Sequence, residues 1–289
     1  MKGALVFNKF YRDDGMDFIK SRLMEVFSAR GVDIDCIVSY ARFAFFKREE
    51  EIKKYDFALF FDKDIPLARF FERCGVRVIN SSKTLEACDD KELTFSVVAD
   101  TGIAMPKTII APLMYDVSDD DGDEFLKEVE ATLKKPIVVK ENVGSQGRQV
   151  YLAESKKDLR VLFSRLKHVP HMYQEYISGE KGSDTRVYVV GKKAVFAVRR
   201  TNTTDFRSNV FLGGKMEKIP LEQALAERAE TIAKRLDLEY GSVDFLGENA
   251  DIFSEANSNA YIKTADNLGA NLAGRLADYV TELVYGTSK

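Results

Sequence analysis

Two acidic residues and an asparagine in the segment GSVDFLGENADIFSEANSN, residues 241–259, have types and a spacing suited to metal binding. They are Asp244, Glu255 and Asn257, and both acids have apolar neighbours in the sequence. Carboxylate and amide oxygens are the ligands that Mg²⁺ prefers in proteins, and bound Mg²⁺ commonly bridges nucleotide phosphates. The pattern therefore predicts a divalent-cation site that acts on phosphate groups.

The register of the predicted hairpin decides whether these side chains meet. A turn at 247–250 would place Asp244 opposite Phe253, with Glu255 one diagonal step away on the same face, about 7–8 Å apart at the backbone. Asn257 follows on that face if the strand continues. A slip of one residue would turn Glu255 to the other face. The alternative to a metal site is a charged strand edge in solvent.

A glycine-bearing loop, GSQG at 144–147, follows an apolar strand at 136–141 and precedes a second strand at about 149–153. Both common phosphate-binding loops, the P-loop and the dinucleotide fingerprint, lead into a helix. This loop is instead predicted to be a hairpin tip, which can fold down as a flap and bind phosphate through backbone N–H groups. The alternative is an ordinary surface hairpin.

A third candidate is the segment VRRTNTTDFRSNVFLGG at 198–214, where Arg199, Arg200 and Arg207 lie close together. Guanidinium groups recognise phosphates and carboxylates through paired hydrogen bonds. The alternative is a charged surface between a strand and a loop. The chain has only two histidines, so histidine-based catalysis is not expected.

The composition favours a globular protein that does not bind nucleic acid. Of 289 residues, 45% are apolar, and 43 basic residues against 46 acidic ones give a net charge of -3. A protein that neutralises nucleic-acid phosphates would be clearly basic. Three separated cysteines suit a reducing compartment. No apolar run is long enough for a membrane span or a signal peptide, so no membrane partner and a cytoplasmic location are expected.

Strands alternate with helices in the first part of the chain, which predicts a small parallel α/β domain. The remaining pattern predicts further strands and three longer helices. The predicted strands lie at 2–8, 35–38, 57–61, 76–79, 136–141, 149–153, 172–177, 185–190, 193–199, 241–246 and 251–255, and the longer later helices at 156–167, 220–236 and 266–285. The predicted domains are 1–88, 89–172 and 173–289.

These motifs, in this order, resemble the ATP-grasp superfamily and, within it, the RimK-type ligases, which join a carboxylate to an amine. The most distinctive match is RRTNTTDFRSN at 199–209, and the resemblance covers nearly the whole chain. It implies a mixed α/β (α+β) ATP-grasp architecture. That architecture has an N-terminal parallel α/β domain, a central lid and a C-terminal ATP-binding domain.

The resemblance also implies roles for individual residues. Lys91 in DDKELTFSVVADTGIAMPKT and Lys140 in PIVVKENVGSQGRQV correspond to two phosphate-side lysines. The segment YQEYI at 173–177 corresponds to an adenine-binding hinge, and Asp184 to a ribose contact. The predicted metal ligands correspond to those of two Mg²⁺ ions, with Mn²⁺ as an alternative. The residues implied to bind ATP are Lys91, Lys140, Gly144, Ser145, Gln146, Gly147, Gln174, Glu175, Tyr176, Ile177, Asp184, Arg207, Ser208 and Asn209, and the implied catalytic residues are Lys140 and Arg207.

The implied reaction is ATP-dependent formation of an amide through an acylphosphate, with release of ADP and phosphate. The implied substrates are a small-molecule, peptide or carrier-protein carboxylate and an amine, for example glutamate. Association into a homo-oligomer is also expected. The chain departs from the family at Leu212, where an arginine is common. It also departs at 258–261, where Ser-Asn-Ala-Tyr replaces a Ser-Pro-Gly-like acceptor loop. The alternative is a nucleotide-binding regulatory module without ligase activity.

Overall fold

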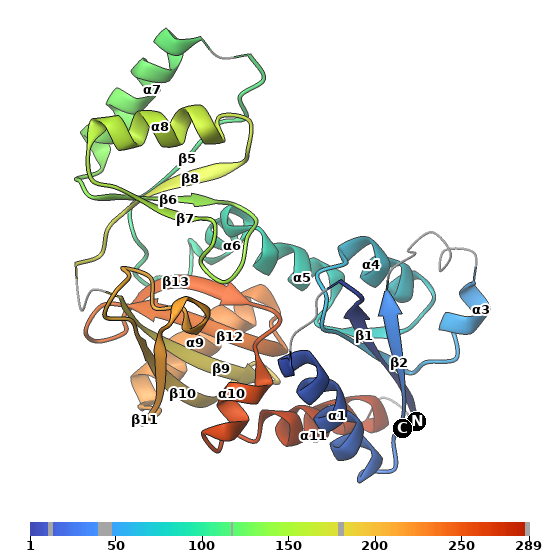
Figure 1. The fold of residues 1–289 in the computed structure, drawn as a ribbon. Coiled ribbons are helices and arrows are strands. Elements are labelled where there is room, and N and C mark those ends of the chain that lie inside the picture. Colours follow the sequence, from blue (N-terminus) through green and yellow to red (C-terminus); the bar gives the residue numbers. More distant parts are fainter. Residues whose placement is uncertain (11–13, 40–47, 117, 179–181, 287–289) are drawn as a thin grey trace.

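The N-terminal part of the chain forms a parallel sheet, as its alternating strands and helices predict. The computed structural model describes residues 1–10, 14–39, 48–116, 118–178 and 182–286. The sheet has the order β2-β1-β3-β4 (Figure 1). Its central strand β1 is almost wholly buried, as expected for a parallel strand covered on both faces. The elements are β1 (Lys2–Asn8), α1 (Asp14–Ser28), β2 (Asp33–Ser39), α3 (Glu49–Ile52), β3 (Phe57–Phe60), α4 (Ile65–Arg73) and β4 (Arg77–Ile79).

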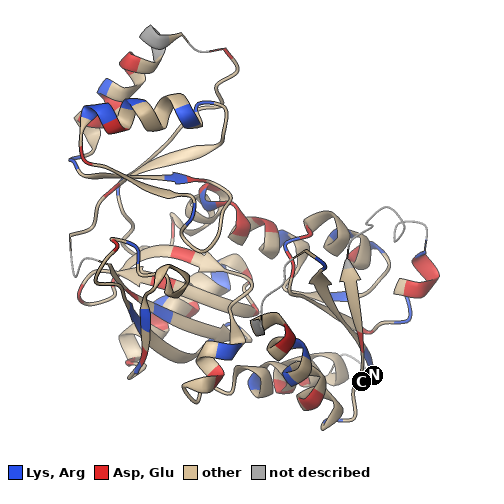
Figure 2. Cartoon of the chain, viewed as in Figure 1, with Lys and Arg blue, Asp and Glu red and all other residues tan. Residues whose placement is uncertain are grey.

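The middle of the chain forms an antiparallel sheet in the order β5-β8-β6-β7, and helices α7 and α8 cover one of its faces (Figure 1). Buried side chains such as Val129, Val139 and Phe163 join these helices to the sheet. Helix α7 has seven acidic residues and one lysine, whereas α8 has four basic residues and one acid. Figure 2 shows charges of both signs on this pair of helices, and an ion pair between Arg160 and Asp123 joins them. The elements are β5 (Thr108–Ile110), α7 (Asp119–Thr132), β6 (Ile137–Glu141), β7 (Val150–Ala153), α8 (Lys156–Leu166) and β8 (His171–Glu175).

The C-terminal part forms an antiparallel sheet in the order β11-β10-β9-β12-β13. One face packs on α9 and α6 through buried residues that include Val187, Val243 and Phe253. Because side chains alternate along a strand, Arg186, Asp244 and their neighbours lie on the opposite face. The elements are α5 (Ser82–Asp89), α6 (Lys91–Val98), β9 (Ser183–Val190), β10 (Lys193–Thr201), η1 (Val210–Leu212), β11 (Lys215–Ile219), α9 (Gln223–Leu236), β12 (Tyr240–Leu246), β13 (Ile252–Asn257), α10 (Ile262–Asn267) and α11 (Leu272–Gly286).

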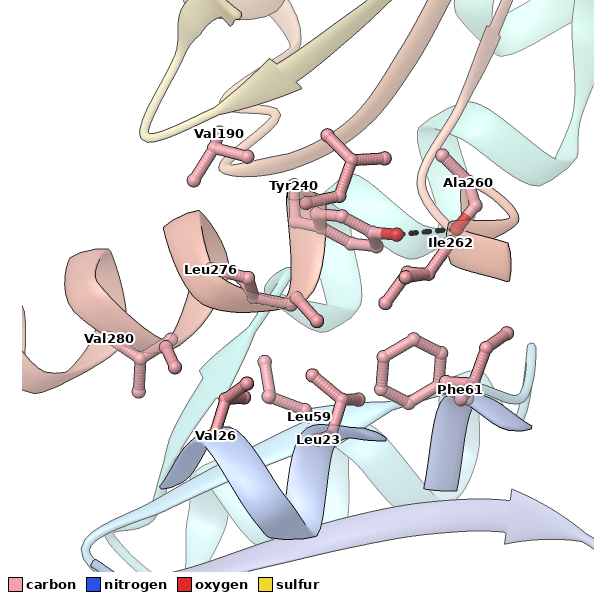
Figure 3. Packing of buried hydrophobic residues seen from close by; sticks show 14 of the residues in the cluster. Leu23, Val26, Leu59, Phe61, Val190, Tyr240, Ala260, Ile262, Leu276 and Val280 are labelled. Atoms are coloured by element: carbon pink, nitrogen blue, oxygen red, sulfur yellow. Dashed lines mark hydrogen bonds between the residues drawn. The ribbon is translucent and has the colours of Figure 1, made fainter. Parts of the chain in front are cut away.

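The N-terminal sheet and the C-terminal sheet share one hydrophobic core. Leu23 of α1 and Leu59 of β3 pack in the same cluster as Tyr240 of β12 and Leu276 of α11 (Figure 3). The Tyr240 hydroxyl donates a hydrogen bond of 2.5 Å to the carbonyl of Ala260, which fixes the loop that follows β13. The N-terminal unit is therefore held firmly against the sheet that carries the predicted site.

The predicted strands and helices are present in the structure, with a correction to the last helix. The single helix expected at 266–285 is two helices, α10 and α11, separated at Gly269, whose φ of 88° is incompatible with a continuous right-handed helix. Strands β5 and β11 were not predicted. We keep the domain limits 1–88, 89–172 and 173–289 as a proposal. In the described part of the chain, no helix is long and apolar enough to cross a membrane.

Candidate active site

A pocket of about 950 Å³ lies between the central sheet and the C-terminal sheet, partly open to solvent. It brings together most of the residues that the sequence singled out. Gln146 and Asn257 do not line it, although the Asn257 amide lies 3.5 Å from a carboxylate oxygen of Asp244. The predicted residues that line it are Lys91, Lys140, Gly144, Ser145, Gly147, Gln174, Glu175, Tyr176, Ile177, Asp184, Arg207, Ser208, Asn209, Asp244 and Glu255.

The two acids of the predicted metal site are direct cross-strand neighbours. Asp244 pairs with Glu255, so the predicted pairing of Asp244 with Phe253 and the diagonal arrangement are wrong. The turn is one residue longer than expected, and Phe253 pairs with Phe245. An irregularity at Ser254 then adds one residue to β13, as a β-bulge does, and returns Glu255 to the face of Asp244.

Two arginines neutralise Asp244 inside the protein. Arg186 donates from Nε and Nη2 to the two carboxylate oxygens at 2.8 and 2.7 Å, and Arg200 donates to Oδ2 at 2.8 Å. Asp244 is only 2% exposed. Burial alone would raise the pKa of Asp244, but the two guanidinium groups outweigh burial and hold this pKa below its ordinary value. Asp244 is therefore a buried, ionised carboxylate.

Arg200 connects this acid to the predicted ribose contact. Its Nε donates to Oδ1 of Asp184 at 2.6 Å, and its Nη2 also bonds Oδ2 of Asp184. Ser208, predicted near the phosphates, donates to the same carboxylate at 2.5 Å. The sequence did not pair Arg186 or Arg200 with Asp244. Positions 186 and 244 are neighbours across β9 and β12, which only the topology reveals.

Both predicted lysines are almost buried at the acidic end of the pocket. Lys91 begins α6, and its Nζ lies 3.8 Å from Oε1 of Glu255. Burial lowers the pKa of Lys140 to about 8. The charge of Lys91 lowers this pKa further, whereas the charge of Glu255 raises it. A buried ammonium group with a lowered pKa is stabilised by any anion that enters the pocket. The pair therefore suits binding of phosphate groups.

The glycine loop is held against the loop that follows β10. Gln146 and Gly147 have φ values of 60° and 74°, and a side chain on Gly147 would come within 2.5 Å of the Asn209 amide. Arg207 donates to the carbonyl of Gly147 at 2.7 Å, and Arg148 stacks over the ring of Phe211 at 4.7 Å. The loop therefore closes the pocket as a flap, and Arg148 anchors it.

The end of β8 and the residues that follow it also line the pocket. The carboxylate of Glu175 accepts a hydrogen bond from the backbone N–H of Lys107 at 2.7 Å, and the Gln174 amide donates to the Thr108 hydroxyl at 3.0 Å. These side chains are thus occupied in joining β8 to the start of β5. The segment 174–177 lines the pocket as the connection between the central and C-terminal sheets.

Comparison with known proteins agrees with this geometry. The family model described as the RimK-like ATP-grasp domain matches residues 88–280, about two thirds of the chain. The chain belongs to the RimK-like ATP-grasp family. A probable alpha-L-glutamate ligase of Legionella pneumophila is 32% identical over 219 residues, which cover 73% of this chain and 69% of the relative. The N-acetylaspartylglutamate synthase A of Homo sapiens is 30% identical over 228 residues, which cover 77% of this chain and 57% of the relative.

Solved structures confirm the predicted ATP-grasp fold. The D-alanine–D-alanine ligase of Bacillus anthracis complexed with ATP superposes with a TM-score of 0.75 and 18% identity, over 99% of this chain and 98% of that one. The predicted membership in the RimK-like group and the predicted ligase class are confirmed by the family match and the names of these relatives. The roles of the site residues in this RimK-like chain are our proposal, which rests on the geometry of the pocket.

The donor set of this RimK-like site fits Mg²⁺ with one condition. Asp244 and Glu255 face each other across two strands, and the side-chain nitrogen of Asn257 donates to Asp244 at 3.5 Å, so Asn257 would have to present its amide oxygen to the ion. Carboxylate and amide oxygens are the ligands that this ion takes. Within the described ranges, no three His, Cys, Asp or Glu side chains gather into a metal site. The condition is that Asp244 exchanges a guanidinium contact for the ion.

The lowered pKa of Lys140 predicts how stability depends on pH. The pKa of Lys140 is about 8 in the folded protein, against an ordinary value of 10.5. Between these values the unfolded chain binds more protons, so the free energy of unfolding gains a contribution that rises with pH and is flat below about 8. We expect Lys140→Met to remove a rise of about 1–2 kcal/mol between pH 8 and 9.5. Urea unfolding of both proteins across this range measures it, and identical slopes would contradict the assignment.

Proposed function

We propose that the protein is an ATP-dependent carboxylate–amine ligase that forms an amide bond through an acylphosphate. The observation that carries this proposal is the content of one pocket. Two nearly buried lysines, Lys91 and Lys140, lie beside Asp244 and Glu255 under a glycine-bearing flap. Positive groups beside oxygen donors for a cation suit the transfer of a phosphoryl group, which depends on charge neutralisation and positioning.

The proposed pose of ATP follows the length of the pocket. Val138, Leu246 and Phe206 supply apolar surface for the adenine near the hinge at 174–177. Asp184 lies further along and would accept from the ribose, and its existing contacts with Arg200 and Ser208 hold it in place. The triphosphate would then extend toward the two lysines, below the flap. Asp244 and Glu255 would hold Mg²⁺, which would neutralise part of the charge of the phosphate groups.

The proposed reaction needs no protein nucleophile. A carboxylate oxygen of one substrate attacks the γ-phosphorus of ATP, the bond to the β-phosphate oxygen breaks, and ADP leaves. The amine then attacks the acyl carbon, inorganic phosphate leaves, and the amine loses a proton. Lys140 would offset charge on the moving phosphoryl group, while Arg207 keeps the flap closed through Gly147. A closed flap excludes water, which would hydrolyse the acylphosphate.

We further propose that the amine is an amino acid such as glutamate. The proposal rests on the names of three relatives: the alpha-L-glutamate ligase of Legionella pneumophila, the N-acetylaspartylglutamate synthase A of Homo sapiens and the beta-citrylglutamate synthase B of Danio rerio. Each of these names contains glutamate. The carboxylate partner would be a small acid, a peptide or a carrier-protein terminus.

The test is a screen for ADP formation from MgATP with pairs of amino acids and carboxylic acids. We expect ADP to form only when both an amine and a carboxylate are present, together with a product whose mass is their sum less one water. N-acetylaspartate and citrate are the first acids to pair with glutamate. ATP binding without ADP formation across the whole panel would instead support a regulatory nucleotide-binding module.

A further inference from the structure

Asp244 has more positive partners than its charge requires. Three guanidinium N–H groups contact its two oxygens, two from Arg186 and one from Arg200, all at 2.7–2.8 Å. All three residues come from adjacent strands of one sheet, where Asp244 pairs directly with Arg186 and Arg200 pairs with Asp184. Hydrogen bonds between ions in a buried site are among the strongest in proteins. Three of the roughly four acceptor positions of the carboxylate are therefore occupied before any ligand arrives.

Binding of a divalent cation conflicts with this arrangement. A cation at Asp244 and Glu255 competes for the two Asp244 oxygens, both of which already accept guanidinium N–H groups. Two guanidinium charges within hydrogen-bond distance of the same carboxylate would also repel the cation, and repulsion is weakly screened in a buried site. Release of one arginine from Asp244 therefore favours binding of the cation.

The contacts identify Arg186 as the group that turns. Arg200 has a second carboxylate partner, Asp184, which keeps its charge paired after Asp244 is lost. The carboxylate contacts of Arg186 all go to Asp244. A buried guanidinium group without an anion is strongly unfavourable. Arg186 would therefore need an anion from outside the protein once the cation has taken Asp244.

We propose that Arg186 is an exchangeable counter-cation of Asp244, which couples cation binding to binding of an anionic substrate group. The inference rests on the proposed function of this pocket. The cation displaces the Arg186 guanidinium, and the freed guanidinium binds a carboxylate or phosphoryl oxygen of the substrate. By linkage, the anion strengthens cation binding by the same factor by which the cation strengthens anion binding. The site then assembles fully only when both ligands are present.

The first test measures binding of Mn²⁺ alone by electron paramagnetic resonance, without nucleotide or substrate. Removal of two charge-assisted hydrogen bonds to Asp244 in Arg186→Met should tighten Mn²⁺ binding at least about tenfold. Arg186→Lys, which keeps the charge without the paired geometry, should fall between this variant and the wild type. The matched control is Arg199→Met, which removes a positive charge from the neighbouring position on the other face of β10. It should leave Mn²⁺ affinity unchanged.

Unchanged or weaker Mn²⁺ binding by a folded Arg186→Met protein would overturn the proposal, as would the absence of Mn²⁺ binding in every variant. A second measurement covers the case in which Arg186→Met does not fold. The Nε–H resonance of Arg186 in the wild type, assigned by its loss in Arg186→Lys, should shift and exchange faster when Mg²⁺ saturates the site. An unaltered resonance would overturn the exchange.

Neither measurement depends on ligase activity. If the protein forms amides but Arg186→Met does not change its Mn²⁺ affinity, the proposed function is supported and the coupling is contradicted. If Arg186→Met tightens Mn²⁺ binding but no substrate pair gives an amide, the coupling is supported and the proposed ligase function is contradicted.

Discussion

The Asp244→Ala variant is expected to lose about 3–5 kcal/mol of unfolding free energy, because it leaves two buried guanidinium groups without their shared carboxylate. Arg186 would lose both of its hydrogen bonds to a carboxylate, and Arg200 would lose one. The same change removes a proposed cation ligand, so ligase activity should fall to background. Urea unfolding followed by circular dichroism measures the stability.

A matched variant on the paired strand separates the buried network from the loss of an acid. Glu255 lies directly opposite Asp244, but its side chain is 30% exposed and the Nζ of its ion-pair partner Lys91 lies 3.8 Å away. Glu255→Ala should therefore cost less than about 1 kcal/mol of stability. A loss below that limit for Asp244→Ala as well would contradict the role of Asp244 as the centre of a buried ion network.

The Glu255→Gln variant is expected to keep its fold and lose at least about 100-fold in the rate of amide formation. The side chain keeps its shape but loses the charge that faces Asp244 and Lys91 across the pocket. The rate loss should appear at saturating substrate, because the carboxylate acts on the phosphoryl group rather than on substrate recognition. Initial rates of ADP and amide formation measure it.

The control for this variant is Glu217→Gln, which removes an acid from the exposed face of β11. It should have wild-type rates. A Glu255→Gln protein with wild-type rates would remove Glu255 from the metal site, whereas an equal loss in both variants would point to a general effect of charge.

The sequence predicted which residues form the site better than it predicted the register of the strands that carry them. Alternation along two strands predicted that Asp244 and Glu255 share a face, and they do, although neither the longer turn nor the bulge at Ser254 was expected. These two errors of one residue cancel at Glu255. A bulge has no compositional signature here, because Ser254 suits a regular strand equally well. The residues on one face were therefore predictable, and the register was not.

Contacts between distant segments lay outside what the sequence could predict. Arg186 and Asp244 are 58 positions apart and meet because β9 pairs with β12 rather than only with its hairpin partner β10. In the same way, the anchor of Arg148 on Phe211 depends on how the central sheet lies over the C-terminal one. Local patterns find strands and turns, but the order of strands in a sheet is set by the whole core.

The most direct test of the account compares ADP formation by the wild type and by Glu255→Gln, with MgATP, glutamate and a panel of carboxylic acids. We predict that the wild type forms ADP and an amide in equal amounts, only when acid and amine are both present, and that Glu255→Gln forms neither at a comparable rate. ADP formation that is the same in both proteins, or that proceeds without any amide, would contradict the assignment of this pocket as the active site of a ligase.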